Sequence, residues 1–101
     1  MPRFVILEHD HPFLHWDLML ETGDMLKTWR LPAPPPVDGS QAQPIGDHRR
    51  MYLDYEGPVS GSRGKVKRWD QGDYEAIVQG ATWTVRLHGG KWQGIISLPL
   101  Q

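Results

Sequence analysis

Short apolar runs that alternate with polar residues recur along this chain, and they predict β-strands. Residues 3–8 and 25–31 each read as one strand. Between them, residues 14–21 alternate with a period of two, which puts Trp16, Leu18 and Leu20 on one face of a strand. A tight turn is expected at residues 22–24, so the N-terminal third should form consecutive antiparallel strands.

The pattern breaks at residues 31–48, where four prolines between Pro32 and Pro36 exclude a helix or a central strand. A long extended loop is expected there. Beyond it we predict a weak strand at 51–55, a loop at 57–64, and two short strands at 65–69 and 74–78. Strands at 82–88 and 92–100, joined by Gly89-Gly90, form the clearest hairpin. No segment shows the 3.6-residue period of an amphipathic helix.

Many short strands with frequent turns predict an all-β fold. The 11 glycines and 9 prolines mark those turns, and 101 residues suit one hydrophobic core. We therefore expect residues 1–101 to form a single domain, a small closed or partly open β-barrel of short antiparallel strands with a long Pro-rich loop.

Composition narrows the setting of the protein. No run approaches the roughly 18 apolar residues of a membrane span, and the N-terminus lacks a signal peptide. The absence of cysteine excludes disulfides and thiolate zinc sites and fits a cytoplasmic location. A net charge of −1 argues against a broad basic surface for nucleic acid, although a small patch could still hold a strand end. We expect a monomer that has no contact with membranes.

His9, His15 and Asp17 place three metal-ligand side chains within nine residues. The alternation puts His15 and Asp17 on the same strand face, roughly 7 Å apart. A turn at residues 10–12 would fold His9 back toward them. Two imidazoles and one carboxylate with open positions suit Mn²⁺, Fe²⁺ or Zn²⁺ in a catalytic site. The alternative is three polar residues on the wet face of a sheet.

His48 and Tyr52 form a second candidate pair after the Pro-rich loop. On an extended segment they would share one face, where a histidine and a phenol could act as general acid and hydrogen-bond donor to a phosphate. The alternative is a loop histidine and a tyrosine at the edge of the core. His11 and His88 are expected to be solvated turn residues.

Four segments in order carry a family resemblance: FVILEHDHPFLHWDLMLETGDMLKTWRLP, GDHRRMYLDYEG, KVKRWDQGDYE and TVRLHGGKWQG. Together they resemble the 3′-phosphoesterase domain of bacterial DNA ligase D. The resemblance implies a compact β-barrel and Mn²⁺-dependent trimming of 3′ ends, in which a terminal ribonucleoside and then the remaining 3′-phosphate are removed. His9, His15 and Asp17 match the metal ligands of that family. His48 matches the histidine that acts on the phosphate, and Tyr52 matches a phosphate contact.

The chain also departs from the family pattern at several positions, including basic residues that the resemblance implies bind phosphate. Leu7 stands in place of a glutamine, Met19 in place of an arginine, and Ala33 in place of a lysine. Gly46 replaces an acidic residue, and no basic residue occurs between Ser40 and Gly46. Candidates to restore the lost charge are Arg30, Arg49 and Arg50.

These observations lead to three hypotheses. The first is a free-standing phosphoesterase that trims 3′ ends in DNA repair, with Mn²⁺ as the expected metal and Zn²⁺, Co²⁺ or Fe²⁺ as alternatives. Its partner would be the 3′ end of DNA or of RNA-terminated DNA, and a separate ligase or polymerase is a further candidate. The second is a catalytically weak or silent metal-binding β-barrel that binds nucleic-acid ends or a repair partner. The third is a β-barrel interaction module whose polar residues decorate a wet rim.

Overall fold

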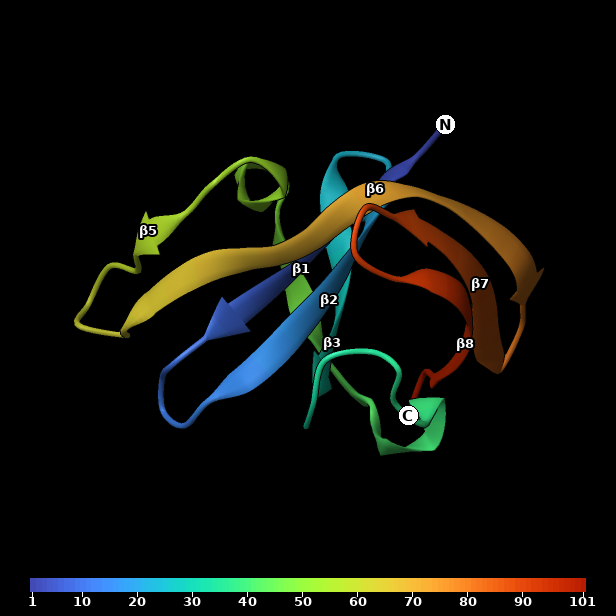
Figure 1. Cartoon of the computed structure of the whole chain (residues 1–101), viewed down its shortest axis with the longest axis horizontal. Helices are drawn as coiled ribbons and strands as arrows, with labels where there is room; N and C mark the ends of the chain where they lie inside the picture. Colours follow the sequence, from blue (N-terminus) through green and yellow to red (C-terminus); the bar gives the residue numbers. More distant parts are fainter.

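The N-terminal third forms the expected run of consecutive antiparallel strands. In the computed structural model, which describes all 101 residues, these are β1 (Arg3–His9), β2 (His15–Thr22) and β3 (Met25–Leu31) (Figure 1). Gly23, in the turn between β2 and β3, has φ of +65°, a backbone conformation that glycine adopts without a steric penalty. The predicted strand limits here are correct to within one residue.

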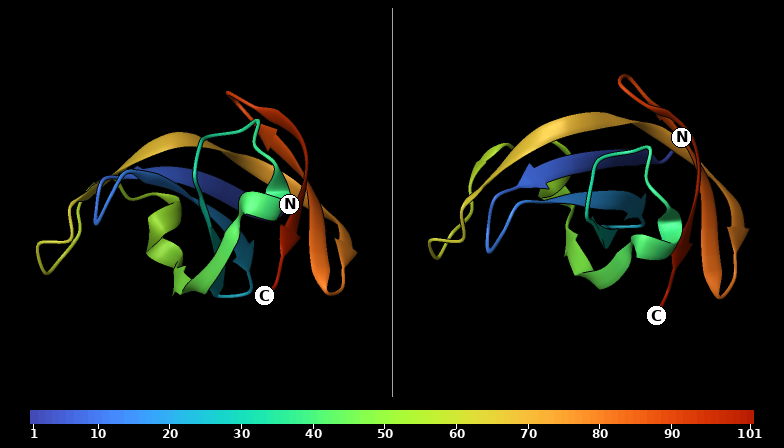
Figure 2. Two further views of the ribbon diagram at one scale, coloured as in Figure 1. Left: turned by 90° about the horizontal axis from the view of Figure 1, so that it is seen from below. Right: turned by 60° about the horizontal axis from the view of Figure 1, so that its bottom comes forward.

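A single antiparallel sheet contains every strand, so the predicted all-β class is confirmed. The remaining elements are η1 (Gly39–Gln41), β4 (Gln43–Arg49), η2 (Arg50–Leu53), β5 (Gly57–Pro58), β6 (Lys65–Gln79), β7 (Thr82–Gly89) and β8 (Gln93–Pro99). The strand order is β4-β3-β2-β1-β6-β7-β8, and β5 pairs with the start of β6. The sheet curls into a half-barrel, with β6 arching along its length (Figure 2).

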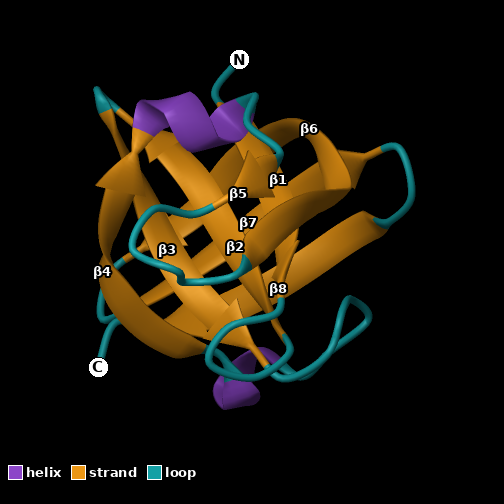
Figure 3. Cartoon of the chain, turned by 90° about the vertical axis from the view of Figure 1, so that its left-hand side faces the viewer, coloured by secondary structure: helices purple, strands orange, loops and turns teal.

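The half-barrel is partly open because its edge strands, β4 and β8, do not pair with each other. The 3₁₀ helix η1 packs against β8 at this gap, so closely that a side chain at Gly39 would collide with the carbonyl oxygen of Ser97. The Trp29 indole crosses from β3 and donates from Nε1 to the carbonyl oxygen of Pro99 at 2.6 Å. Figure 3 shows the two 3₁₀ helices at opposite ends of the curled sheet.

Both faces of the sheet are covered by apolar side chains. The larger core comprises Phe4, Ile6, Leu18, Leu20, Trp29, Leu31, Ala42, Tyr74, Val85, Leu87, Ile96 and Leu98. The opposite face carries the smaller core, which comprises Val5, Leu7, Met19, Leu26, Leu53 and Val66. Residues 4–7 of β1 are therefore all fully buried, alternately in one core and the other.

Two expectations around the Pro-rich segment are wrong. The loop expected at 31–48 ends early, because residues 43–49 form the edge strand β4 against β3. This strand has almost no apolar alternation and contains Pro44, which an edge strand tolerates because one side of it needs no backbone pairing. The strand expected at 51–55 is instead the helix η2, whose Leu53 is buried in the smaller core.

The two strands expected at 65–69 and 74–78 are one continuous strand, β6. Gly72 stands in its interior, where a side chain would collide with the carbonyl oxygen of His88 on β7. The glycine therefore marks a close approach between neighbouring backbones rather than a strand end. Within the loop expected at 57–64, Gly57–Pro58 forms the short strand β5.

Neither 3₁₀ helix has the length and apolar character that a membrane crossing would require.

Candidate metal centre

The β1–β2 hairpin brings His9, His15 and Asp17 together on the face of the smaller core. His9 pairs directly with His15 in the antiparallel register, and Asp17 lies two residues further along β2 on the same face. One potential ligand atom from each side chain lies within 4.8 Å of the other two. His15 and Asp17 are buried, at 1% and 3% exposure, and His9 is half-buried.

Hydrogen bonds to the backbone use one nitrogen of each imidazole. Nδ1 of His15 lies 2.8 Å from the carbonyl oxygen of Phe13, and Nε2 of His9 lies 2.8 Å from that of Arg63. A carbonyl oxygen only accepts, so these two nitrogens must carry the hydrogens. In the neutral rings, Nε2 of His15 and Nδ1 of His9 are then left as lone-pair donors for a metal.

These nitrogens face the Asp17 carboxylate. Nε2 of His15 lies 3.3 Å from Oδ1 of Asp17, and Nδ1 of His9 lies 3.7 Å from Oδ2. Nε2 of His15 and Oδ1 of Asp17 are both buried without a hydrogen-bond partner. Two ligands that share one metal at about 2.1 Å lie roughly 3–3.5 Å apart. The donor types, their spacing and their unmet polar atoms thus fit a divalent cation.

His48 and Tyr52 lie close together beside this cluster, although the sequence argument for their proximity was wrong. They do not share an extended segment, since His48 is on β4 and Tyr52 is on η2. Their ring centroids are 6.0 Å apart in an edge-on arrangement. Nδ1 of His48 donates to the carbonyl oxygen of Gly46 at 2.8 Å, which leaves Nε2 as its second functional atom.

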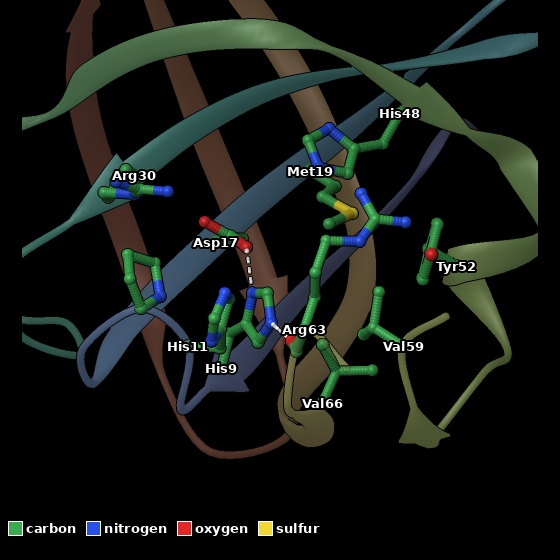
Figure 4. A pocket seen from close by; sticks show the side chains of 11 residues that line it. His9, His11, Asp17, Met19, Arg30, His48, Tyr52, Val59, Arg63 and Val66 are labelled. Atoms are coloured by element: carbon green, nitrogen blue, oxygen red, sulfur yellow. Dashed lines mark hydrogen bonds and ion pairs between the residues drawn. The ribbon is translucent and has the colours of Figure 1, made fainter. Parts of the chain in front are cut away.

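One pocket of about 260 Å³ contains four of the five predicted residues. It is lined by His9, His11, Pro12, Asp17, Met19, Arg30, His48, Tyr52, Val59, Arg63 and Val66. Figure 4 shows Asp17 and His9 in the middle of this pocket, with His48 and Tyr52 on one side and Arg30 on the other. His15, the fifth residue, does not line this pocket, but its ring centroid lies 5.0 Å from that of His9.

Arg63 is the pocket residue that sequence reasoning missed. It lies in the segment predicted as a loop, and its side chain lines the pocket together with His9, Met19 and Tyr52 (Figure 4). The available signal was a single arginine among glycines in a tight loop. His11, expected to be a solvated turn residue, is exposed but also lines the pocket.

A charged cluster holds η2, and therefore Tyr52, against the sheet. Glu21 of β2 accepts from the Arg50 side chain and, at 3.0 Å, from the backbone N–H of Arg3. The bond from Arg50, followed by that from Arg3, lowers the pKa of the Glu21 carboxyl below its usual value. Arg3 in turn pairs with Asp54 at 2.8 Å, at the end of η2. Arg50 therefore anchors η2 and is absent from the pocket lining, as is Arg49.

The half-barrel and its cluster of two histidines and one carboxylate define a small β-barrel protein with a candidate metal centre. Residues 7–98 match the family described as the DNA ligase D 3′-phosphoesterase domain, and the chain belongs to this family.

Relatives of this chain include much longer proteins. It is 34% identical over 81 residues to the multifunctional non-homologous end joining protein LigD of Pseudomonas aeruginosa, a match that covers 74% of this chain and 10% of that protein. It is 32% identical over 106 residues to LigD proteins of Mycobacterium bovis and Mycobacterium tuberculosis, covering 94% of this chain and 14% of each relative. The chain thus spans only about a tenth to a seventh of the length of these relatives.

Proposed function

We propose that this chain is a metal-dependent phosphoesterase that trims 3′ ends of nucleic acid in non-homologous end joining. Its substrate would be DNA that ends in a 3′-phosphate or a 3′-ribonucleoside. Membership of the 3′-phosphoesterase family supports this function. The names of its relatives, which are end-joining proteins, support the repair context.

One structural observation carries the proposal. Lone pairs from His9, His15 and Asp17 converge, and no N–H or O–H group of the chain satisfies the buried Nε2 of His15 or Oδ1 of Asp17. Each buried polar atom left in this state costs about 1–3 kcal/mol. Buried polar atoms without hydrogen-bond partners are rare in native structures, and a bound cation that these atoms coordinate best explains their presence here.

His9 through Nδ1, His15 through Nε2 and Asp17 through its carboxylate would hold the metal, for which Mn²⁺ is our first choice and Zn²⁺, Co²⁺ or Fe²⁺ are alternatives. When bound, such a metal supplies a Lewis acid that offsets negative charge on phosphoryl oxygens. His48, when protonated, would donate from Nε2 to a phosphate oxygen, since its Nδ1 is already bound to Gly46. Tyr52 would donate from its phenol and orient the phosphate.

A second candidate function is a weak or silent relative that binds 3′ ends without hydrolysing them. It is favoured by Met19, a fully buried apolar side chain on the pocket wall where the family pattern has an arginine. Losing one charge-assisted contact to a phosphate typically lowers the rate by about 10²–10³-fold.

The test is release of inorganic phosphate from a primer–template that carries a 3′-phosphate, measured with Mn²⁺ and with EDTA. The proposal expects release that requires Mn²⁺ and falls by at least about 100-fold in His15→Ala and in His48→Ala. His88→Ala is the matched control, because His88 is an exposed histidine of β7 outside the pocket.

Circular dichroism and thermal unfolding establish that each variant is folded before its rate is compared. A folded wild-type protein that binds the primer and Mn²⁺ but releases no phosphate would contradict the enzyme and leave the silent relative. Equal activity in all three histidine variants would exclude this site from the reaction.

A further inference from the structure

We propose that Arg30 and Arg63 form a phosphate-binding pair that replaces the basic residues missing from the family positions. This inference rests on the proposed function and names the part of the pocket that selects a 3′-phosphate over a 3′-hydroxyl. Both arginines line the pocket, one from β3 and the other from the loop between β5 and β6.

Arg63 brings a positive charge into the pocket whose wall includes Met19. It lines the same pocket as Met19, His48 and Tyr52, and in the view of Figure 4 its side chain extends toward the side of the pocket on which these three residues lie. Nε of Arg63 donates to the carbonyl oxygen of Ser60 at 2.7 Å, and Nη2 lies 3.2 Å from Oγ of the same serine. These bonds orient the fork while leaving other N–H groups free to donate to a phosphate.

The loop that carries Arg63 is anchored to the metal-side hairpin. The carbonyl oxygen of Arg63 accepts from His9, as described above, and the backbone N–H of Lys65 donates to Oδ1 of Asp10 at 2.8 Å. Gly64, with φ of +74°, lets the loop approach so closely that a side chain there would collide with Asp10. Arg63 therefore orients the candidate ligand His9 through its backbone carbonyl group and contributes a positive charge through its side chain.

Arg30 lies on the opposite side of the pocket. It is the cross-strand neighbour of Asp17, yet it forms none of the ion pairs of the chain. Its Nε is buried with no hydrogen-bond partner, and its guanidinium carbon lies 5.4 Å from the centre of the Phe13 ring. This guanidinium lies near an aromatic ring and has a buried N–H group without an acceptor, so it is suited to bind an anion.

The pocket contains no other lysine or arginine. The two guanidiniums stand on either side of Asp17 and His9 in Figure 4, so a phosphate placed over the metal cluster would lie between them. Arginine suits this task because its planar fork can donate two parallel hydrogen bonds to phosphate oxygens. The pair thus offers the charge that Met19 and Ala33 cannot supply.

The experiment measures binding without turnover. Fluorescence anisotropy in EDTA compares a primer–template ending in 3′-phosphate with one ending in 3′-hydroxyl, for wild type, Arg30→Gln, Arg63→Gln and the control Arg86→Gln. Arg86 is an exposed arginine of β7 outside the pocket, so its loss removes the same charge elsewhere. We expect wild type to prefer the 3′-phosphate, each pocket variant to lose about tenfold of that preference, and Arg86→Gln to keep it.

A Mn²⁺-dependent rise in melting temperature, retained in both pocket variants, shows that they are folded and keep the metal cluster. Equal binding of the two primers by wild type, or an unchanged preference in both pocket variants, would overturn the pair. A preference that depends on the pair, without any phosphate release when Mn²⁺ is added, supports the pair and contradicts the enzyme. Phosphate release by a protein that shows no preference for the 3′-phosphate would support the enzyme and contradict the pair.

Discussion

At the scale of single residues, the pocket histidines are oriented by backbone carbonyl groups. His9, His15 and His48 each donate one ring N–H to a carbonyl oxygen at 2.8 Å. Each such bond selects a tautomer and directs the other nitrogen, as is usual for histidines that bind metals or act on a substrate. The hydrogen bond of one ring nitrogen to a backbone carbonyl group therefore determines which other nitrogen can bind a metal or a substrate.

A buried carboxylate away from the pocket has a comparable role in the fold. Asp70 accepts hydrogen bonds of 2.9–3.0 Å from the backbone N–H groups of Gln71, Gly90, Lys91 and Trp92, and so holds the β7–β8 turn. We expect Asp70→Asn to lower the free energy of unfolding by about 2–4 kcal/mol. The asparagine amide replaces one accepting oxygen with an NH₂ group, which cannot accept a hydrogen bond from these backbone N–H groups. Urea denaturation measures this change.

Asp73→Asn is the control for that measurement, because Asp73 is exposed on the same strand. Its effect should stay within about 0.5 kcal/mol. Equal stability of the two variants would show that the Asp70 carboxylate is not required for the turn.

At the scale of elements, the position of Tyr52 depends on how η2 is attached. This helix has only four residues, too few to be stable alone. Leu53 anchors its apolar side in the smaller core, and two ion pairs, Arg50 with Glu21 and Arg3 with Asp54, hold its polar side. Tyr52 is thereby presented to the pocket by contacts that lie outside it.

The Glu21 contacts predict a pH dependence of stability. Hydrogen bonds from Arg50 and from the Arg3 backbone lower the pKa of Glu21 from its ordinary value of 4.5. The ionised carboxylate therefore stabilises the folded state fully above about pH 4.5, and this contribution is lost as the pH falls through the lower folded-state value. We expect Glu21→Gln to cost about 1 kcal/mol at pH 7 and much less at pH 3.

Urea denaturation of wild type and Glu21→Gln at both pH values checks this. Asp24→Asn, in the exposed β2–β3 turn, serves as the control for a lost surface carboxylate. A difference between wild type and Glu21→Gln that stays constant with pH would contradict the argument.

At the scale of the whole molecule, the site lies on the face of the smaller core rather than inside the larger one. Alternation along β2 sends Leu18 and Leu20 to the larger core and leaves His15, Asp17 and Met19 on the other face. The larger core contains 12 buried residues and the smaller core 6, so most of the core residues pack on the face opposite the polar cluster. The pocket can contain buried polar atoms without hydrogen-bond partners because packing elsewhere in the molecule offsets the free energy that these atoms cost.

Metal binding should stabilise the entire sheet by linkage. At 100 times its Kd, a ligand specific to the folded state adds about 2.7 kcal/mol, which raises Tm by roughly 10–20 °C in a domain of this size. We expect Mn²⁺ to raise Tm accordingly in wild type and in His88→Gln, and to leave Tm unchanged in His15→Gln. Differential scanning fluorimetry with and without Mn²⁺ measures these shifts, and an equal rise in His15→Gln would remove His15 from the metal site.

Local patterns in the sequence determined the all-β class, the N-terminal strands, the C-terminal hairpin and the grouping of His9, His15 and Asp17. These features depend on alternation and on short turns, so neighbouring residues carry the whole signal. The donor types of the candidate metal centre were likewise readable, because one hairpin supplies them all.

Only the tertiary structure decided the rest of the site. The edge strand β4 forms through backbone pairing and needs no apolar pattern, and η2 forms because Leu53, Arg3 and Glu21 hold it in place. His48 and Tyr52 reach the pocket through these two elements, and Arg63 reaches it through a loop docked on the β1–β2 turn. The contacts that place these residues join positions 13 to 55 apart in the sequence and produce no periodic pattern. The pocket therefore became visible only in the folded chain.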